Sequence, residues 1–155
     1  MWKGANNDTY IGEWRHNKAE GFGVHTWSNS DKYEGEWKSC LKHGKGTDMF
    51  ANGDVYIGHY SFGKPEGFGH YMWQNGSSYA GEFKNGLKNG KGKWRKSKNE
   101  RANEYEGEYC NDKKNGRGIF RWASGNVYEG EYKDDERDGQ GEMRWTDGSV
   151  YSGEW

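Results

Sequence analysis

The sequence predicts an all-β fold, an elongated, twisted antiparallel meander of β-hairpin repeats, and three observations carry that prediction. A short motif, Tyr-x-Gly-Glu-aromatic, returns at nearly constant spacing along the 155 residues. Inside the motif, side chains alternate between two faces, which is the period of a β-strand. Aromatic residues (9 Trp, 11 Tyr and 6 Phe) take the place of the aliphatic residues that usually form a core.

The first element of each repeat is a predicted strand that starts at a tyrosine. In Tyr33-Glu-Gly-Glu-Trp37 the tyrosine, the glycine and the tryptophan share one face. Consecutive tyrosines are 23 residues apart, except for 26 between Tyr79 and Tyr105. We therefore predict one repeat domain over residues 1–155, with repeats that start at Tyr10, Tyr33, Tyr56, Tyr79, Tyr105 and Tyr128 and a partial repeat at Tyr151.

The second element is a predicted strand built around Gly-x-Gly, such as Gly44-Lys-Gly46. Turns such as Asn52-Gly53 join it to the next repeat, because Asn, Asp and Gly tolerate the positive φ of tight hairpins. Glycine weakens a strand unless another group approaches closely, so we expect a Tyr or Trp ring over the glycines of the neighbouring strand. A ladder of rings on glycines would then replace an aliphatic core.

The pattern is interrupted in the fourth repeat and at the two ends. Three extra residues follow Lys93, which predicts a bulge or extended loop over 96–104, and Trp94 stands two residues before the expected aromatic position, at Lys96. The N-terminal residues around Trp2 fit half a repeat. The chain stops inside a repeat at Trp155, and repeat arrays usually need terminal caps, so we expect a piece of a longer protein.

The unit formed by Tyr-x-Gly-Glu-Trp and the later Gly-x-Gly resembles the MORN repeat (membrane occupation and recognition nexus) over essentially the whole chain. The resemblance implies a MORN repeat array, an elongated twisted sheet with an aromatic groove. Proteins with such repeats include junctophilins, alsin, radial-spoke head proteins, cytoskeletal MORN proteins of parasites, a SET-domain lysine methyltransferase and phosphatidylinositol phosphate kinases. In these families the repeats resemble scaffolds or targeting modules, and any catalysis resides in another domain.

Composition bounds the location and the partners. The net charge of -1 favours neither nucleic acid nor a membrane surface as a global partner. The two cysteines, Cys40 and Cys110, have no metal-ligand or redox spacing, which is typical of reduced thiols in an intracellular protein. No apolar run approaches a membrane span and no signal peptide is evident. We expect a cytoplasmic protein, with membrane or cytoskeletal association left open.

No residue set in the sequence predicts catalysis, a cofactor or a metal. The repeated glutamates, such as Glu36, would see nearly the same environment in each unit, whereas acid–base catalysis needs carboxylates in unlike environments. Cross-strand pairing with residues such as Lys45, Lys91 and Arg117 accounts for them instead. The five histidines lack metal-ligand spacing, and no helix follows the Gly-x-Gly motifs. We therefore predict a non-enzymatic protein without cofactor or metal.

Two surface clusters are candidate binding sites. The first is basic and contains one acid, Glu100, so it is suited to anionic lipid headgroups, although a solvated loop is the simpler reading. Its residues are Lys84, Lys88, Lys91, Lys93, Arg95, Lys96, Lys98 and Arg101. The second is apolar and lies on the face opposite the predicted aromatic ladder in repeats one to three, where it suits a protein partner. Its residues are Ile11, Phe22, Val24, Met49, Ile57, Phe68 and Met72.

Three functions compete on this evidence. The first is a scaffold that binds a helix or extended segment of a protein partner. The second is a targeting module for anionic phospholipid such as phosphoinositide, which would direct or regulate an attached membrane-associated enzyme. The third is glycan or choline binding on exposed rings, which the expected cover of each ring by glycine disfavours. A homodimer through the sheet ends or the apolar face also stays open.

Overall fold

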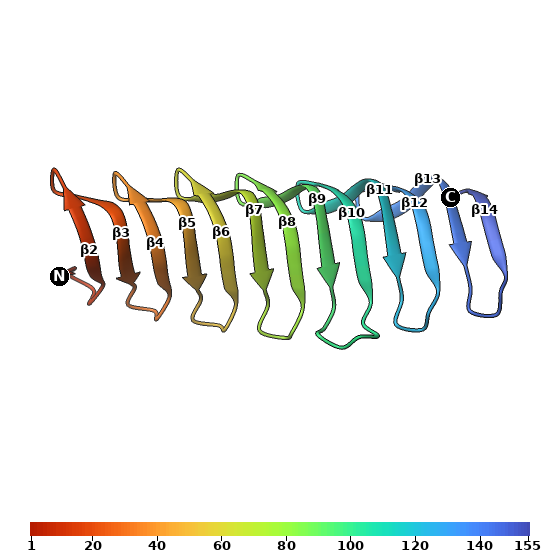
Figure 1. Ribbon diagram of the computed structural model, residues 1–155, viewed down its shortest axis with the longest axis horizontal. Helices are drawn as coiled ribbons and strands as arrows, with labels where there is room; N and C mark the ends of the chain where they lie inside the picture. The colour runs from red at the N-terminus through yellow and green to blue at the C-terminus, as the bar shows by residue number, and fades with distance from the viewer. The chain divides into compact units, whose positions relative to one another are not determined.

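The computed structural model describes residues 1–155 and contains fourteen β-strands and no helix (Figure 1). The strands fall into two compact units, Met1–Gln74 and Asn75–Trp155. In the first unit the strands are β1 (Trp2–Lys3), β2 (Thr9–Arg15), β3 (Lys18–Thr26), β4 (Lys32–Lys38), β5 (Leu41–Met49), β6 (Val55–Ser61) and β7 (Lys64–Met72). In the second unit they are β8 (Ser78–Lys84), β9 (Leu87–Arg95), β10 (Glu104–Cys110), β11 (Lys113–Arg121), β12 (Val127–Lys133), β13 (Glu136–Arg144) and β14 (Val150–Glu154).

Within each unit, every strand pairs antiparallel with the strands before and after it in the chain (Figure 1). This confirms the predicted all-β meander of hairpin repeats. The N-terminal residues pair as half a repeat, although Trp2 on β1 pairs with Tyr10 on β2 at the position that Asp48 takes against Tyr56, and not at the position of the turn residue Phe50. That residues 1–155 form a single domain stays a prediction.

The core of each unit is a row of tyrosines. Tyr33 is 0 % exposed, and a methyl group placed on Gly46 of the neighbouring strand would overlap its ring. The tyrosine hydroxyl donates a hydrogen bond to the carbonyl oxygen of Glu36 at 2.8 Å, so its polar end is satisfied although the ring is buried. The same ring-on-glycine contact recurs in each repeat, which confirms the predicted ladder. The matching tyrosines are Tyr10, Tyr56, Tyr79, Tyr105 and Tyr128.

A second row of rings joins one tyrosine to the next. Tyr33 meets Trp37 and Tyr60 edge-to-face, with ring centroids 4.9 and 5.3 Å apart and interplanar angles of 84° and 89°. Such T-shaped pairs stabilise a structure by about 0.5–1.5 kcal/mol beyond their buried area. Trp37 also donates its indole N–H to the carbonyl oxygen of Gly23 at 3.0 Å. Aromatic contacts therefore run continuously along each unit where a globular domain would have aliphatic ones.

The first glycine of each Gly-x-Gly has a different purpose from the second. Gly44 has a φ of 62° and lies at a β-bulge, where the register shifts between Gly35 and Trp37. There the carboxylate of Glu36 accepts a hydrogen bond from the backbone N–H of Lys45 at 2.6 Å. The predicted pairing of these glutamates with strand-B lysine or arginine side chains is therefore wrong, because the backbone amide exposed by the bulge is the partner. The glutamates that accept this bond are Glu13, Glu36, Glu82, Glu108 and Glu131.

The interruption in the fourth repeat is an extended loop, one of the two forms predicted, and it lies between Arg95 and Glu104. The pairing of β9 with β10 continues without a bulge up to these residues. Trp94 is not a displaced copy of the turn aromatic, as the spacing had indicated. It pairs with Tyr79 and Tyr105, at the position that Tyr71 and Phe120 take in their repeats.

Candidate functional site: the aromatic face

We call the side of each unit that carries the tyrosines the aromatic face. In several repeats, the residue nine positions after the first tyrosine is basic, and its charged group lies over the aromatic rings of this face. The ammonium nitrogen of Lys42 lies 5.0 Å from the ring centroid of Trp27 and 5.2 Å from that of Tyr33, within cation–π range. The cations at this position are Lys42, Lys88, Lys114 and Arg137. Repeats one and three have Ala19 and Pro65 there instead.

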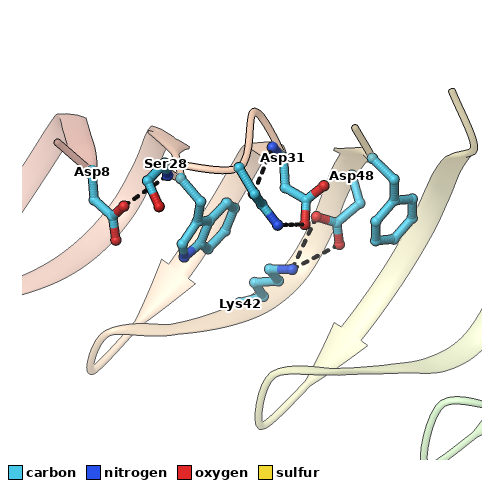
Figure 2. Close-up of a pocket in the computed structure, with 8 residues that line it drawn as sticks. Asp8, Ser28, Asp31, Lys42 and Asp48 are labelled. Atoms are coloured by element: carbon cyan, nitrogen blue, oxygen red, sulfur yellow. Dashed lines mark hydrogen bonds and ion pairs between the residues drawn. The ribbon is translucent and has the colours of Figure 1, made fainter. Parts of the chain in front are cut away.

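The first unit has a pocket of about 270 Å³ on this face (Figure 2). Its lining residues are Asp8, Trp27, Ser28, Asn29, Asp31, Lys42, Asp48 and Phe50. Asp48 is a charged residue that is buried, with 4 % of its surface exposed. Its carboxylate lies 2.9 Å from the ammonium nitrogen of Lys42 and accepts a hydrogen bond from the Tyr60 hydroxyl. Burial beside this carboxylate raises the pKa of Tyr60 well above its ordinary value.

Three aspartates line the edge of this face, and we call Asp8, Asp31 and Asp54 the acidic rim. Each stands two residues before a tyrosine and accepts a hydrogen bond from a backbone N–H of the following turn. Asp8 accepts from Ser28 at 2.8 Å, as drawn in Figure 2. Asp31 and Asp54 accept from Ala51 and Gln74 at 2.7 and 2.8 Å. The side chains therefore tie each hairpin turn to the next.

The negative charges of the rim are poorly compensated. Asp31 and Asp54 make no ion pair, and the basic side chain paired with Asp8 is that of His25, whose Nε2 lies 3.9 Å from the carboxylate. Burial lowers the pKa of His25, which favours its neutral form. The pKa of Asp54 is held below its usual range by hydrogen bonds from the Gln74 N–H and the Tyr71 hydroxyl. The rim therefore carries net negative charge beside the aromatic pocket.

In the second unit the equivalent positions are neutral, namely Ser77, Asn103, Asn126 and Ser149. Asn103 and Asn126 accept the same backbone hydrogen bond that the aspartates accept, from Ala123 at 2.7 Å and from Thr146 at 3.1 Å. A pocket of about 490 Å³ lies on this face, and it is lined by two basic residues, Lys114 and Arg137, and two acidic residues, Asp135 and Glu136. It is lined by Lys114, Phe120, Trp122, Tyr132, Asp135, Glu136, Arg137 and Trp155.

The structure divides the predicted basic cluster. Lys88 lies on the aromatic face, with its ammonium 5.3 Å from the ring centroid of Tyr109. Glu104 lies 3.1 Å from Arg95 and 3.7 Å from Lys93, so it offsets part of the charge. The members on the opposite face are Lys84, Lys91, Lys93 and Arg95, and those in the loop are Lys96, Lys98 and Arg101.

The predicted apolar patch lies on the face opposite the tyrosines, and it is interrupted. Ile11 pairs with Val24, which next meets Glu34 on β4. A second apolar row joins Met49 to Met72 through Val55. The most exposed members are Ile11, Phe22, Ile57 and Phe68 at 58, 52, 48 and 61 %. Glu34 on β4 thus separates two small apolar groups.

Cys40 and Cys110 are free and exposed. No group of three or more His, Cys, Asp or Glu side chains comes together in a way that could hold a metal ion. No segment forms a helix with the length and hydropathy needed to cross a membrane.

The cation row and the acidic rim were both missed in the sequence. Their signal was present, because each residue keeps a fixed offset from the repeat tyrosine. It went unused because these positions vary in residue type between repeats.

The chain is built from hairpins that stack rings on glycines and differ mainly along one face. This architecture is that of a β-repeat protein, in which each repeat contacts only its neighbours. The chain belongs to the MORN repeat family, whose model matches residues 10–32, 33–55, 56–78, 79–101, 105–127 and 128–150. The MORN repeat is a non-catalytic repeat type, and it is consistent with a scaffold for protein or membrane interaction. A sequence search of curated proteins returned no match.

Among solved structures, the fold is similar to the SAS-4 (dCPAP) TCP domain of Drosophila melanogaster, in complex with a Proline Rich Motif of Ana2 (dSTIL). The TM-score is 0.56, the sequence identity is 12%, and the match covers 98% of this chain and 81% of that one. At this identity the likeness shows a shared fold alone.

Proposed function

We propose that the chain is a non-catalytic scaffold that binds an extended segment of a protein partner on its aromatic face. The observation that carries the proposal is the pocket of the first unit, where the rings of Trp27 and Phe50 stand beside charged groups. Binding sites for peptides combine apolar rings, which supply affinity, with polar groups that set specificity. The TCP domain, which shares this fold, is bound to a proline-rich motif, and this supports a peptide ligand for the present chain.

A displayed library of random peptides tests this function. Clones are selected on the wild-type chain and then measured on two variants. Trp27→Ala/Trp122→Ala removes rings from the aromatic face, and Phe22→Ala/Phe68→Ala removes exposed rings from the opposite face. We expect the clones to lose binding to the first variant and to keep it on the second. The reverse result would move the binding site to the predicted apolar patch and refute the proposal.

A second candidate function is binding of anionic phospholipid, which would target an attached domain to a membrane. It is supported by the members of the basic cluster that make no ion pair, among them Lys91, Lys96, Lys98 and Arg101. Each basic residue near an anionic surface contributes about 1 kcal/mol. Co-sedimentation with phosphoinositide vesicles at physiological salt, lost when Lys91, Lys93, Arg95 and Lys96 become Glu, would support it. Absence of binding at physiological salt would exclude it.

A further inference from the structure

The pocket of the first unit is chemically specific. Its walls are formed by Trp27 and Phe50, and its one cation, Lys42, is neutralised by Asp48 at 2.9 Å. The carboxylates of Asp8 and Asp31 remain at its edge (Figure 2). Aromatic walls with an uncompensated negative edge are complementary to a ligand that is apolar and cationic.

The turn-to-turn hydrogen bond does not require the negative charge of the rim. Asn103 and Asn126 accept the same turn-to-turn hydrogen bond in the second unit with a neutral amide oxygen. Asparagine at all three rim positions would therefore keep the turn-to-turn bond and remove the charge, and it would weaken the side-chain bonds that Asp31 accepts from Asn29 and Asp54 accepts from Tyr71. The turn-to-turn bond leaves the negative charge of the carboxylates unused, and this charge is available to a cationic ligand.

The spacing of the rim indicates the conformation of that ligand. Asp8, Asp31 and Asp54 precede β2, β4 and β6, so neighbouring rim residues are two strands apart. Two strand spacings amount to about 9.6 Å. One turn of a polyproline II helix contains three residues and rises about 9.3 Å. A polyproline II segment that crosses the strands would therefore present the same side chain position to each rim aspartate.

We propose that the aromatic face of the first unit binds a partner segment in polyproline II conformation that carries Lys or Arg at every third residue. The basic side chains pair with Asp8, Asp31 and Asp54, and the intervening prolines pack against Trp27 and Phe50. A preformed polyproline II helix loses little entropy on binding, which favours this ligand on an aromatic surface. The inference rests on the proposed protein-binding function and names the chemistry of its partner.

Labelled peptides on the complete chain test the inference by fluorescence anisotropy at physiological salt. The main probe consists of four Arg-Pro-Pro triplets. Comparison probes replace Arg with Gln or Glu, or keep the composition and alternate the Arg spacing between two and four residues. The rim variant is Asp8→Asn/Asp31→Asn/Asp54→Asn. The control, Glu106→Gln/Glu129→Gln/Glu142→Gln, removes as many negative charges from the second unit, on the face opposite its own tyrosines.

We expect the Arg-Pro-Pro probe to bind most tightly and the rim variant to weaken it about tenfold, equivalent to about 1.4 kcal/mol. The control variant should bind within about twofold of wild type, since its glutamates are not part of the acidic rim. Equal affinity of the rim variant, of the Glu probe or of the probe with irregular spacing would overturn the inference, as would failure of every probe to bind. Equal binding of the Gln probe that is lost in Trp27→Ala would overturn the inference while leaving the proposed function standing.

Discussion

In each repeat one glycine lies beneath a tyrosine ring, and the contact leaves no room for a methyl group. The tyrosine is buried because the backbone of the neighbouring strand comes within van der Waals distance of its ring, which only glycine permits. Six such pairs run along the chain, one for each matched repeat. The stability of a unit therefore depends on the absence of a Cβ atom at these glycines as well as on the tyrosine rings.

Gly46→Ala tests this dependence. The added methyl group would overlap the ring of Tyr33, so we expect the free energy of unfolding to fall by about 1–3 kcal/mol. Gly76→Ala is the control, because its Cβ would meet nothing within 4 Å and only its φ of 96° opposes the substitution. Urea unfolding followed by circular dichroism gives both values. A loss of less than about 1 kcal/mol for Gly46→Ala would contradict the ring-on-glycine account.

The repeated glutamate provides a second test at the scale of the residue. The carboxylate of Glu36 accepts the backbone N–H of Lys45, so Glu36→Ala should lower the free energy of unfolding by about 1 kcal/mol. Glu36→Gln keeps an acceptor oxygen and should lose less. If the glutamate instead acted through ion pairs, Gln and Ala would be equally destabilising, and added salt would abolish the difference from wild type.

At the scale of the element, the hairpins of one unit share a continuous row of buried phenols. Burial raises the pKa of Tyr56 to about 12 and that of Tyr33 and Tyr79 further still. In the unfolded chain a tyrosine ionises near pH 10. Ionisation of a buried phenol places a charge in an apolar environment, so it should weaken the pairing of the strands that cover the ring.

The sign of the alkaline effect follows from linkage. The folded protein keeps these phenols protonated at higher pH than the unfolded chain does, so their contribution is complete below about pH 10. It is lost as the pH rises from about 10 towards the folded pKa of about 12 for Tyr56. We expect tyrosinate absorbance at alkaline pH to appear together with loss of the β-sheet circular dichroism signal. Tyrosinate that forms near pH 10 while the sheet signal persists would show that the rings are not held as described.

At the scale of the whole molecule, the repeats share a frame and differ along one face. The rim is acidic in the first unit and neutral in the second. The cation row runs the other way, with Lys42 alone in the first unit and Lys88, Lys114 and Arg137 in the second. These differences leave the ring-on-glycine contacts unchanged, so partner specificity can vary without changing the fold.

The contrast between a constant frame and a variable face explains which features the sequence could predict. The strands, the turns and the ring ladder were predictable because Tyr33, Gly46 and their counterparts repeat without change. The partner of Glu36 was not, because a bulge exchanges a side-chain partner for a backbone one and leaves no mark in the spacing. The acidic rim was missed because its positions differ in charge between repeats. Asp31 and Asn126 accept the same backbone hydrogen bond, but only Asp31 is charged.

The central claim is that the aromatic face is the binding face, and NMR mapping of a selected peptide on the labelled chain tests it most directly. The account predicts shifts of the Trp27 indole N–H and of the backbone amides of Ser28, Ala51 and Gln74, which lie along the acidic rim. Shifts centred instead on the side chains of Ile11, Phe22, Ile57 and Phe68, with the Trp27 indole unchanged, would contradict it.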